Sequence, residues 1–361
     1  MAYLEIKNIL KKYGGKIVLN NISFDIFKGE IFAIAGPPGS GKTSLLKIIA
    51  GLLPPDEGKI YLEGRDITNT PPSARGIGML FEIPPLYPDR TGFENIAFPL
   101  RLQKLPENEV RKRVYEVADL LGIKHLLDRT PGTYSGGEYQ RAALARVLVR
   151  RPNILLLDEP LRNLDAKIQE IMRSWFKRLQ RELGITMIYA THDPFEGMAV
   201  SDRMAILLNG VVKQLGKPFE TYFNPKSLDV AEYVSIPAIN ILEGSVKLLD
   251  DTLNIRIDEI SISKRIREKS IFMGKEKVLV GIRPEDIIVS KEPGAGKIEG
   301  KVSLIQVFGS DILLTIEIHG TAIRAMAEKA SGIREGETIY LKFNEEKIYL
   351  FDPETKDAIN V

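Results

Sequence analysis

The stretch "GPPGSGKTS", residues 36–44, follows the apolar run "IFAIAG" at 31–36 and opens the helical pattern "TSLLKIIAG". A strand, a glycine-rich turn with Gly-Lys-Thr, and a helix together form a phosphate-binding loop, whose backbone amides close around an anion. A turn that matches by chance is the alternative, which the flanking strand and helix disfavour. The residues predicted to bind the nucleotide here are Gly36, Pro37, Pro38, Gly39, Ser40, Gly41, Lys42, Thr43 and Ser44.

Within this loop, Lys42 is expected to reach the terminal phosphates, and the Thr43 hydroxyl to ligate Mg²⁺. A second apolar run, "NILLLDEP" at 153–160, ends on two adjacent carboxylates. We predict that Asp158 holds the magnesium and that Glu159 orients or deprotonates an attacking water.

A third apolar run, "ITMIYATHD" at 185–193, ends beside His192. Continuous apolar runs suit strands buried on both faces of a parallel α/β sheet, where ligands bind at the carboxyl ends of the strands. His192 is therefore either structural or, as we favour, in contact with the γ-phosphate.

The stretch "TYSGGEYQRAAL", residues 133–144, places two glycines at the start of a helical pattern. Ser135 and Glu138 match a capping box, which would satisfy the first amides of the helix without any ligand. The capping box leaves Gly136 and Gly137 unexplained, and a helix N-terminus with unobstructed amides is also an anion site. On these residues alone the two interpretations stand about even.

Composition limits the function classes. The length of 361 residues favours two domains, and 50 Lys and Arg against 48 Asp and Glu lack the basic excess of nucleic-acid binders. The absence of cysteine excludes disulfides and thiolate metal sites, and three histidines disfavour a histidine-rich metal centre. Neither a signal-peptide pattern nor an apolar stretch of about 18 residues occurs, so we expect any membrane link to come through a partner.

The hydrophobic pattern of the sequence changes near residue 240. Before it, apolar runs alternate with helical patterns such as "AKIQEIMRSWFKRLQREL", where Trp175 follows the apolar face and is expected in the core. After it, short runs such as "KVLVGIRPEDIIVS" and "DILLTIEIHG" are separated by Gly, Pro and charged turns. We predict an α/β P-loop domain over residues 1–235 and a small all-β domain over residues 236–361.

Taken in order, the motifs of the first domain resemble those of ATP-binding-cassette (ABC) ATPases. They are Tyr13, "GPPGSGKTS", Phe81-Glu82, "SGGEYQR", "LLLDEP", "NLDA" and "THD". The resemblance covers residues 1 to about 235. It implies that Tyr13 stacks on adenine, that Asp165 lies in the loop crossing to a partner cassette, and that His192 is the switch histidine.

The same resemblance implies that Ser135, Gly136 and Gly137 bind the γ-phosphate of ATP held by a second copy of the chain. This would resolve the open question about the two glycines, because each chain's own phosphate loop already holds a nucleotide. The implied protein is a homodimeric ATPase with two shared sites for ATP and Mg²⁺.

In the second domain, "VGIRPEDI" at 280–287 and "LFDPETKDAI" at 350–359 resemble the OB-like β-barrel regulatory domain of maltose-type and multiple-sugar importers. The resemblance implies an ATPase at the cytoplasmic face of the membrane, bound to two polytopic membrane subunits and served indirectly by an extracytoplasmic solute-binding protein. Importers of iron, oxyanions or polyamines share such domains and are the alternative.

Two other classes of protein fit the sequence less well. A soluble cassette acting on nucleic acid or ribosomes, with the barrel as reader, is disfavoured by the near-neutral charge, so we expect no nucleic-acid partner. A small-molecule kinase would not require "SGGEYQR".

Five positions depart from the family pattern: Tyr134 replaces leucine, Glu138-Tyr139 replaces two glutamines, Arg162 replaces serine, and Glu82 replaces glutamine. We expect Glu82 to ligate Mg²⁺ through a carboxylate oxygen; otherwise it would repel the phosphate from outside the ligand shell.

The segment following Glu82, "PPLYPDRTGFENIAFPL" at 84–100, is expected to dock a membrane partner through Tyr87 and Phe93. The alternative is a loop that packs its own aromatics.

Overall fold

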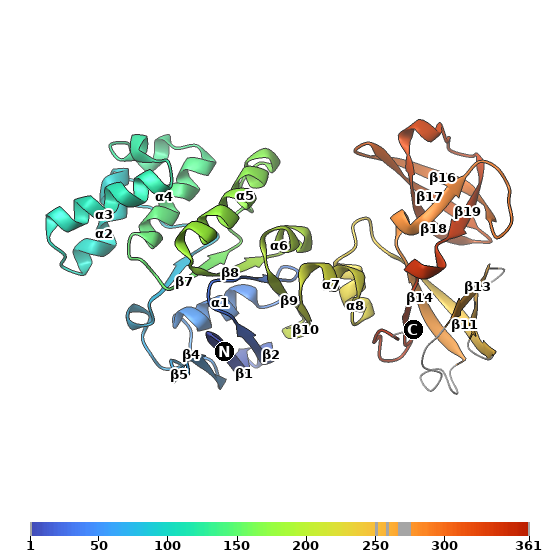
Figure 1. The fold of residues 1–361 in the computed structure, drawn as a ribbon, viewed down its shortest axis with the longest axis horizontal. Helices are drawn as coiled ribbons and strands as arrows, with labels where there is room; N and C mark the ends of the chain where they lie inside the picture. Colours follow the sequence, from blue (N-terminus) through green and yellow to red (C-terminus); the bar gives the residue numbers. More distant parts are fainter. Residues whose placement is uncertain (1, 250–251, 258–259, 266–275, 360–361) are drawn as a thin grey trace. The chain divides into compact units, whose positions relative to one another are not determined.

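The chain folds into two compact units, Met1–Thr221 (unit 1) and Tyr222–Val361 (unit 2). The computed structural model, drawn in Figure 1, describes residues 2–249, 252–257, 260–265 and 276–359. The domain boundary predicted at residue 235 stays a prediction. It falls just after two short helices, α7 (Pro218–Phe223) and α8 (Leu228–Tyr233).

Unit 1 is built on a six-stranded sheet of order β10-β9-β3-β8-β7-β6. All neighbouring strands run parallel except β10, which pairs antiparallel with β9 at the edge. Every residue of β3, β7 and β8 is buried, as expected for continuous apolar runs inside a parallel sheet. The strands are β3 (Ile31–Ala35), β6 (Ile77–Leu80), β7 (Ile154–Asp158), β8 (Thr186–Thr191), β9 (Arg203–Leu208) and β10 (Val211–Gly216).

A second, antiparallel sheet of unit 1 has the order β2-β1-β4-β5. Its strands are β1 (Leu4–Tyr13), β2 (Lys16–Ile26), β4 (Glu57–Leu62) and β5 (Arg65–Asp66). Apolar side chains of this sheet share one core with helix α1 (Lys42–Ala50) and with β3 and β7. The phosphate loop, residues 36–44, runs from β3 into α1, so that core fixes both of its ends.

Helices α2 (Gly92–Leu102), α3 (Glu107–Leu120) and α4 (Gly136–Leu148) contact one another and form the helical lobe of unit 1 (Figure 1). Helix α4 also contacts β6. Helices α5 (Ala166–Leu183) and α6 (Pro194–Val200) complete the unit. Trp175 on α5 is half-buried and packs edge-on against Phe176 at the margin of the predicted core. No helix in the described part of the chain combines the length and apolarity that a bilayer span requires.

Unit 2 consists of two antiparallel five-stranded sheets, in agreement with the predicted all-β, OB-like barrel. Apolar side chains from both sheets form a single core. One sheet contains β11 (Asn240–Leu249), β12 (Thr252–Ile257), β13 (Ile260–Arg265), β14 (Lys277–Ile282) and β20 (Tyr349–Phe351). The other contains β15 (Ile287–Ser290), β16 (Ile298–Phe308), β17 (Asp311–Ile318), β18 (Thr321–Glu328) and β19 (Thr338–Phe343).

Candidate functional site

The glycines of the phosphate loop occupy positions that a side chain cannot fill. A Cβ on Gly36 would collide with the carbonyl oxygen of Leu207, and one on Gly41 would lie 2.9 Å from the carbonyl oxygen of Val18. Gly39 and Gly41 have φ angles of +81° and +105°, a region that favours glycine. A Cβ on Gly39 would face open space, so only the φ angle favours glycine at that position.

Ser40, in the middle of this loop, has a buried side chain, and its hydroxyl is the one buried side-chain polar atom of the described residues without a hydrogen-bond partner. An unpaired buried hydroxyl costs about 1–3 kcal/mol. A glycine-rich loop that leaves this hydroxyl without a partner fits an anionic ligand such as a nucleotide phosphate.

Lys42 begins α1 with its side chain turned back under the loop and only 5% exposed. Its ammonium donates hydrogen bonds to the carbonyl oxygens of Gly36 at 2.7 Å and Pro37 at 3.2 Å. The same Nζ lies 3.3 Å from Oε1 of Glu159. The structure therefore joins the predicted phosphate-binding lysine to the predicted catalytic carboxylate.

Glu159 directly follows β7 and has a φ of +48°, an uncommon conformation for a residue other than glycine. Strained residues of this kind cluster at functional sites. Its Oε2 lies 2.6 Å from Nδ1 of His192 and accepts a hydrogen bond from the His192 amide at 3.2 Å. Lys42, Glu159 and His192 therefore form one chain of contacts across the ends of β3, β7 and β8.

The two predicted magnesium ligands from the ends of these elements also meet. The Thr43 hydroxyl donates to Oδ1 of Asp158 at 3.1 Å. Burial raises the pKa of Asp158, and the charges of Glu159 and Glu82 raise it further. A hydroxyl beside a carboxylate is a donor set that a hard cation accepts. The described residues contain no cluster of three or more His, Cys, Asp or Glu that could hold a metal, and the magnesium ligands stay predictions.

Glu82, the third predicted magnesium ligand, is held by an arginine. Its Oε1 accepts a hydrogen bond at 2.8 Å from Nη1 of Arg162 in the loop after β7. Sequence reasoning identified both residues as departures from the family pattern but missed that they pair. Their opposite charges, placed after two strands that could be neighbours, were the available signal.

Tyr13 lies at the end of β1 with its ring 46% exposed. Its hydroxyl is 3.5 Å from the hydroxyl of Ser44, and the ammonium of Lys11 lies 5.7 Å from the ring centroid. An exposed aromatic ring beside the phosphate loop has a free face on which a base can stack. The adenine-stacking role of Tyr13 stays a prediction.

The first turn of α4 contains a complete capping box. Glu138 N donates to the Ser135 hydroxyl at 3.3 Å, and Ser135 N donates to Glu138 Oε2 at 2.8 Å. The Ser135 amide and His125 hold the pKa of Glu138 at about 2.

The two glycines of this turn have a packing role as well. A Cβ on Gly136 would lie 3.1 Å from the side chain of Leu164, and one on Gly137 would lie 3.4 Å from Ile168. Asp165 caps α5 by accepting a hydrogen bond from Ile168 N at 3.0 Å. The contacts of Ser135, Gly136, Gly137 and Asp165 with a second copy stay predictions.

The two tyrosines that depart from the family pattern near this turn tie α4 to its surroundings. The Tyr134 hydroxyl lies 3.1 and 2.9 Å from the carbonyl oxygens of Leu126 and Arg129. The Tyr139 hydroxyl donates to the carbonyl of Pro84 at 3.0 Å. These substitutions therefore anchor the helical lobe and the loop after Glu82.

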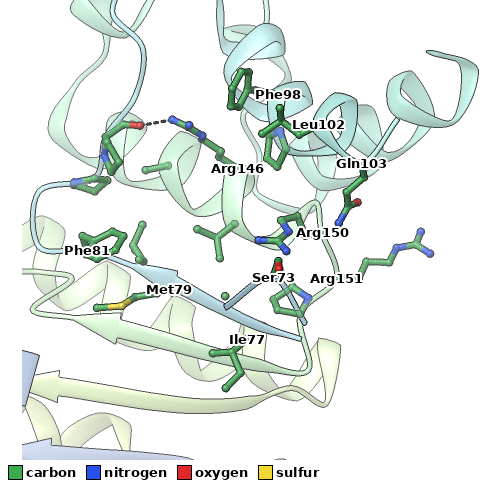
Figure 2. Close-up of a pocket in the computed structure, with 18 of the residues that line it drawn as sticks. Ser73, Ile77, Met79, Phe81, Phe98, Leu102, Gln103, Arg146, Arg150 and Arg151 are labelled. Atoms are coloured by element: carbon green, nitrogen blue, oxygen red, sulfur yellow. Dashed lines mark hydrogen bonds between the residues drawn. The ribbon is translucent and has the colours of Figure 1, made fainter. Parts of the chain in front are cut away.

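A groove of about 420 Å³ lies between β6 and helices α2 and α4 (Figure 2). Phe81, Phe98 and Leu102 line it, and Leu102 is 68% exposed. At its rim Arg146 donates a hydrogen bond to the carbonyl of Pro85, and Arg150 also borders the groove (Figure 2). The groove is apolar with a basic edge.

The two aromatics predicted to dock a partner are half-buried and pack within the chain. The ring of Tyr87 meets Phe98 edge-on at 5.1 Å, between the guanidinium groups of Arg90 and Arg146 at 4.8 and 4.5 Å. Phe93 packs against the core of the helical lobe. Phe98 and Leu102, rather than Tyr87 and Phe93, line the groove.

Comparisons with known proteins agree with this geometry. Residues 19–162 match the family "ABC transporter", and residues 280–351 match the family "TOBE domain". The trehalose/maltose import ATP-binding protein MalK of Thermococcus litoralis is 37% identical over 99% of this chain and 100% of its own. The molybdate/tungstate import ATP-binding protein WtpC of Pyrococcus horikoshii is 41% identical over 96% of this chain and 99% of its own. The solved structure of cbiO1 from Clostridium perfringens, part of the ABC transporter complex cbiONQ, is 33% identical, covers 61% of this chain and 90% of its own, and has a TM-score of 0.57.

Proposed function

The chain belongs to the family of ABC transporter ATPases, and from that membership we propose that it hydrolyses ATP to drive the import of a sugar. The observation that carries the proposal is the contact chain of Lys42, Glu159 and His192 beside the Thr43–Asp158 pair. These contacts bring an ammonium, a carboxylate and an imidazole together at one edge of the parallel sheet, beside the glycine-rich loop, which supports the proposal.

Each residue of the site has a chemical task in this proposal. Lys42 exchanges the loop carbonyls and Glu159 for phosphate oxygens, which releases the carboxylate to take a proton from the attacking water. His192 holds that carboxylate in place through Nδ1. Thr43, Asp158 and Glu82 would hold Mg²⁺, which when bound neutralises charge developing on the phosphates.

Two copies of the chain are proposed to act together, each offering Ser135, Gly136 and Gly137 to the ATP of the other. The amides of the first turn of α4 and its positive dipole end suit a phosphate. Because the capping box and the packing account for these residues within one chain, the dimer needs its own test, given in the Discussion.

A membrane subunit is proposed to bind the groove between β6, α2 and α4, and would hold the ATPase at the cytoplasmic face. The exposed Leu102 and the ring of Phe98 provide an apolar seat, and Arg146 and Arg150 favour an acidic segment beside it. Two polytopic subunits, with an extracytoplasmic solute-binding protein acting indirectly, complete the proposed importer.

The solute is proposed to be a sugar because relatives of nearly equal length import trehalose/maltose, xylose/arabinose and glucose. Molybdate or tungstate is the second candidate, supported by the 41% identity of WtpC. ATP hydrolysis by the complex purified with its membrane subunits and binding protein, reconstituted in vesicles, decides between them. Stimulation by maltose or trehalose supports the sugar, whereas stimulation by molybdate alone would replace it.

A further inference from the structure

The ion pair between Glu82 and Arg162 joins two loops that border the phosphate site. Glu82 follows β6 and Arg162 follows β7, and these strands pair in parallel from Ile77↔Ile154 to Leu80↔Leu157. Their carboxyl ends therefore meet at one edge of the sheet, the same edge that presents Asp158 and Glu159. Nη1 of Arg162 lies 2.8 Å from Oε1 of Glu82.

The charges around this pair explain why the arginine matters. Asp158 and Glu159 already place two buried carboxylates at the site, where Lys42 faces Glu159. Glu82 adds a third anion close to where the phosphates of ATP would bind. Like charges at short range repel, so an uncompensated Glu82 would weaken binding of the phosphates. Arg162 places a positive charge directly on it.

Arg162 also restricts where the carboxylate of Glu82 can lie. The hydrogen bond uses Oε1 alone, so Oε2 is the oxygen that remains for another ligand. Both side chains are partly exposed, Arg162 by 46% and Glu82 by 35%. Exposed ion pairs contribute little to folding stability, so we expect little change in stability when this pair is broken.

Resting on the proposed nucleotide site, we propose that Arg162 is a positioning residue for Glu82: it holds and neutralises that carboxylate beside the phosphate loop, so that the two residues set affinity for magnesium nucleotide as a unit. Glu82 without Arg162 would then lower affinity for the nucleotide, whereas the intact pair would not. Replacing the pair with the neutral residues usual in the family should therefore do less harm than replacing the arginine alone.

A double-mutant cycle tests this unit. The four proteins are the parent chain, E82Q, R162S and E82Q/R162S, and the measurement is calorimetric affinity for a non-hydrolysable ATP analogue with Mg²⁺ at low salt. We expect R162S to weaken binding about tenfold, because it leaves Glu82 unpaired, and E82Q/R162S to return within about threefold of the parent. The R162S defect should shrink at 0.5 M salt, since screening weakens the repulsion, and R162K should recover most of the affinity.

A matched control is available in the helical lobe. Arg101 and Glu107 form an ion pair of similar length, 2.7 Å, and similar exposure, 45% and 51%. R101S should leave nucleotide affinity unchanged, and the thermal unfolding temperatures of the variants without nucleotide should agree within a few degrees.

Three results would contradict the proposed role of the Glu82–Arg162 pair or the nucleotide site on which it rests. Equal loss of affinity from R162S in the parent and in the E82Q background, or no loss in either, overturns the coupling of the two residues. A defect that salt and R162K leave unchanged overturns the electrostatic role. Failure of the parent chain itself to bind the analogue overturns the proposed nucleotide site.

Discussion

Each unit of the molecule contains a buried cationic side chain, and the two differ in the groups that surround them. In unit 1, Lys42 is 5% exposed and bound to two loop carbonyls and to Glu159, next to a serine hydroxyl without a partner. In unit 2, Arg283 is 1% exposed and lies on the ring of Tyr222, 3.6 Å from its centroid.

The guanidinium of Arg283 is held by side-chain and backbone groups of unit 2. It donates to the Ser235 hydroxyl at 3.2 Å and to the carbonyl of Tyr222, and the ring of Tyr349 lies 5.1 Å away. The Tyr222 hydroxyl in turn donates to Glu285 at 2.7 Å. A buried cation held by a hydroxyl, a carbonyl and two rings stabilises a fold, whereas one beside glycine amides and an open hydroxyl is prepared for a ligand.

The largest expected effect follows from removing the charge of Lys42. Lys42→Met should lower ATP affinity and hydrolysis by about 10²–10³-fold, the usual loss for one electrostatic contact to a reacting group. Stability without nucleotide should fall, because the substitution leaves the buried carboxylate of Glu159 and two loop carbonyls without the ammonium. Calorimetric binding and denaturant unfolding measure the two quantities. Unchanged ATP affinity would place Lys42 with Arg283 as a structural cation.

The second-largest effect is expected from replacing Glu159, the carboxylate that Lys42 contacts. Glu159→Gln should slow hydrolysis about 10²–10⁴-fold, since it removes the general base, while ATP binding persists. With magnesium ATP trapped, this variant should dimerise, as light scattering at high protein concentration will report. The exposed Glu107→Gln is the control and should hydrolyse ATP at the parent rate.

Two outcomes would contradict that prediction in different ways. Parental hydrolysis by Glu159→Gln would remove Glu159 from the catalytic role. Slow hydrolysis with a persistently monomeric protein would instead retain the base and reject the shared site at Ser135, Gly136 and Gly137.

A substitution of Arg283 is expected to change stability and to leave nucleotide binding unchanged. Arg283→Lys keeps the charge but loses the planar group that stacks on Tyr222 and reaches Ser235, and should destabilise unit 2 by about 2 kcal/mol. Limited proteolysis and thermal unfolding measure this loss, and nucleotide affinity should stay at the parent value. A variant as stable as the parent would show that Arg283 is dispensable to the packing of unit 2.

Local patterns predicted much of this molecule. The buried strands, the phosphate loop and the meeting of Thr43 with Asp158 follow from apolar runs that end on polar residues in a parallel sheet. The Glu82–Arg162 pair and the packing of Arg283 on Tyr222 were missed. Both depend on which distant segments lie side by side. Glu82 and Arg162 are 80 positions apart in the sequence, and no periodic pattern predicts their contact.

The capping box at the start of α4 was predicted, but not the way the fold would use its glycines. Gly136 and Gly137 looked like bare backbone left for a ligand. In the structure, the side chains of Leu164 and Ile168 also lie close to them, so packing offers a second reason for glycine there.

A substitution of Glu138 in that capping box shows whether the start of α4 has a structural role, like Arg283, or binds a ligand, as proposed for Lys42. Its pKa is lowered to about 2, chiefly by the Ser135 amide and then by His125, whose Nε2 lies 3.0 Å from Oε1. Because the folded-state pKa lies below the unfolded value, this carboxylate stabilises the fold above about pH 4.5, and the contribution disappears as pH falls towards 2.

Glu138→Gln should therefore lower stability slightly at pH 7, by about 0.5–1 kcal/mol for a weakened cap, and the two unfolding curves should converge as pH falls below 4. Urea unfolding across pH 7 to 2 measures this difference, and His125→Gln, which removes only the second contact, should give a smaller one. Curves that stay parallel at all pH values would contradict the ionised cap. If the variant keeps its ATP-driven dimerisation, Glu138 acts within its own chain, as Arg283 does. If dimerisation is lost while stability is kept, the turn from Ser135 to Glu138 takes part in binding a ligand, as is proposed for Lys42.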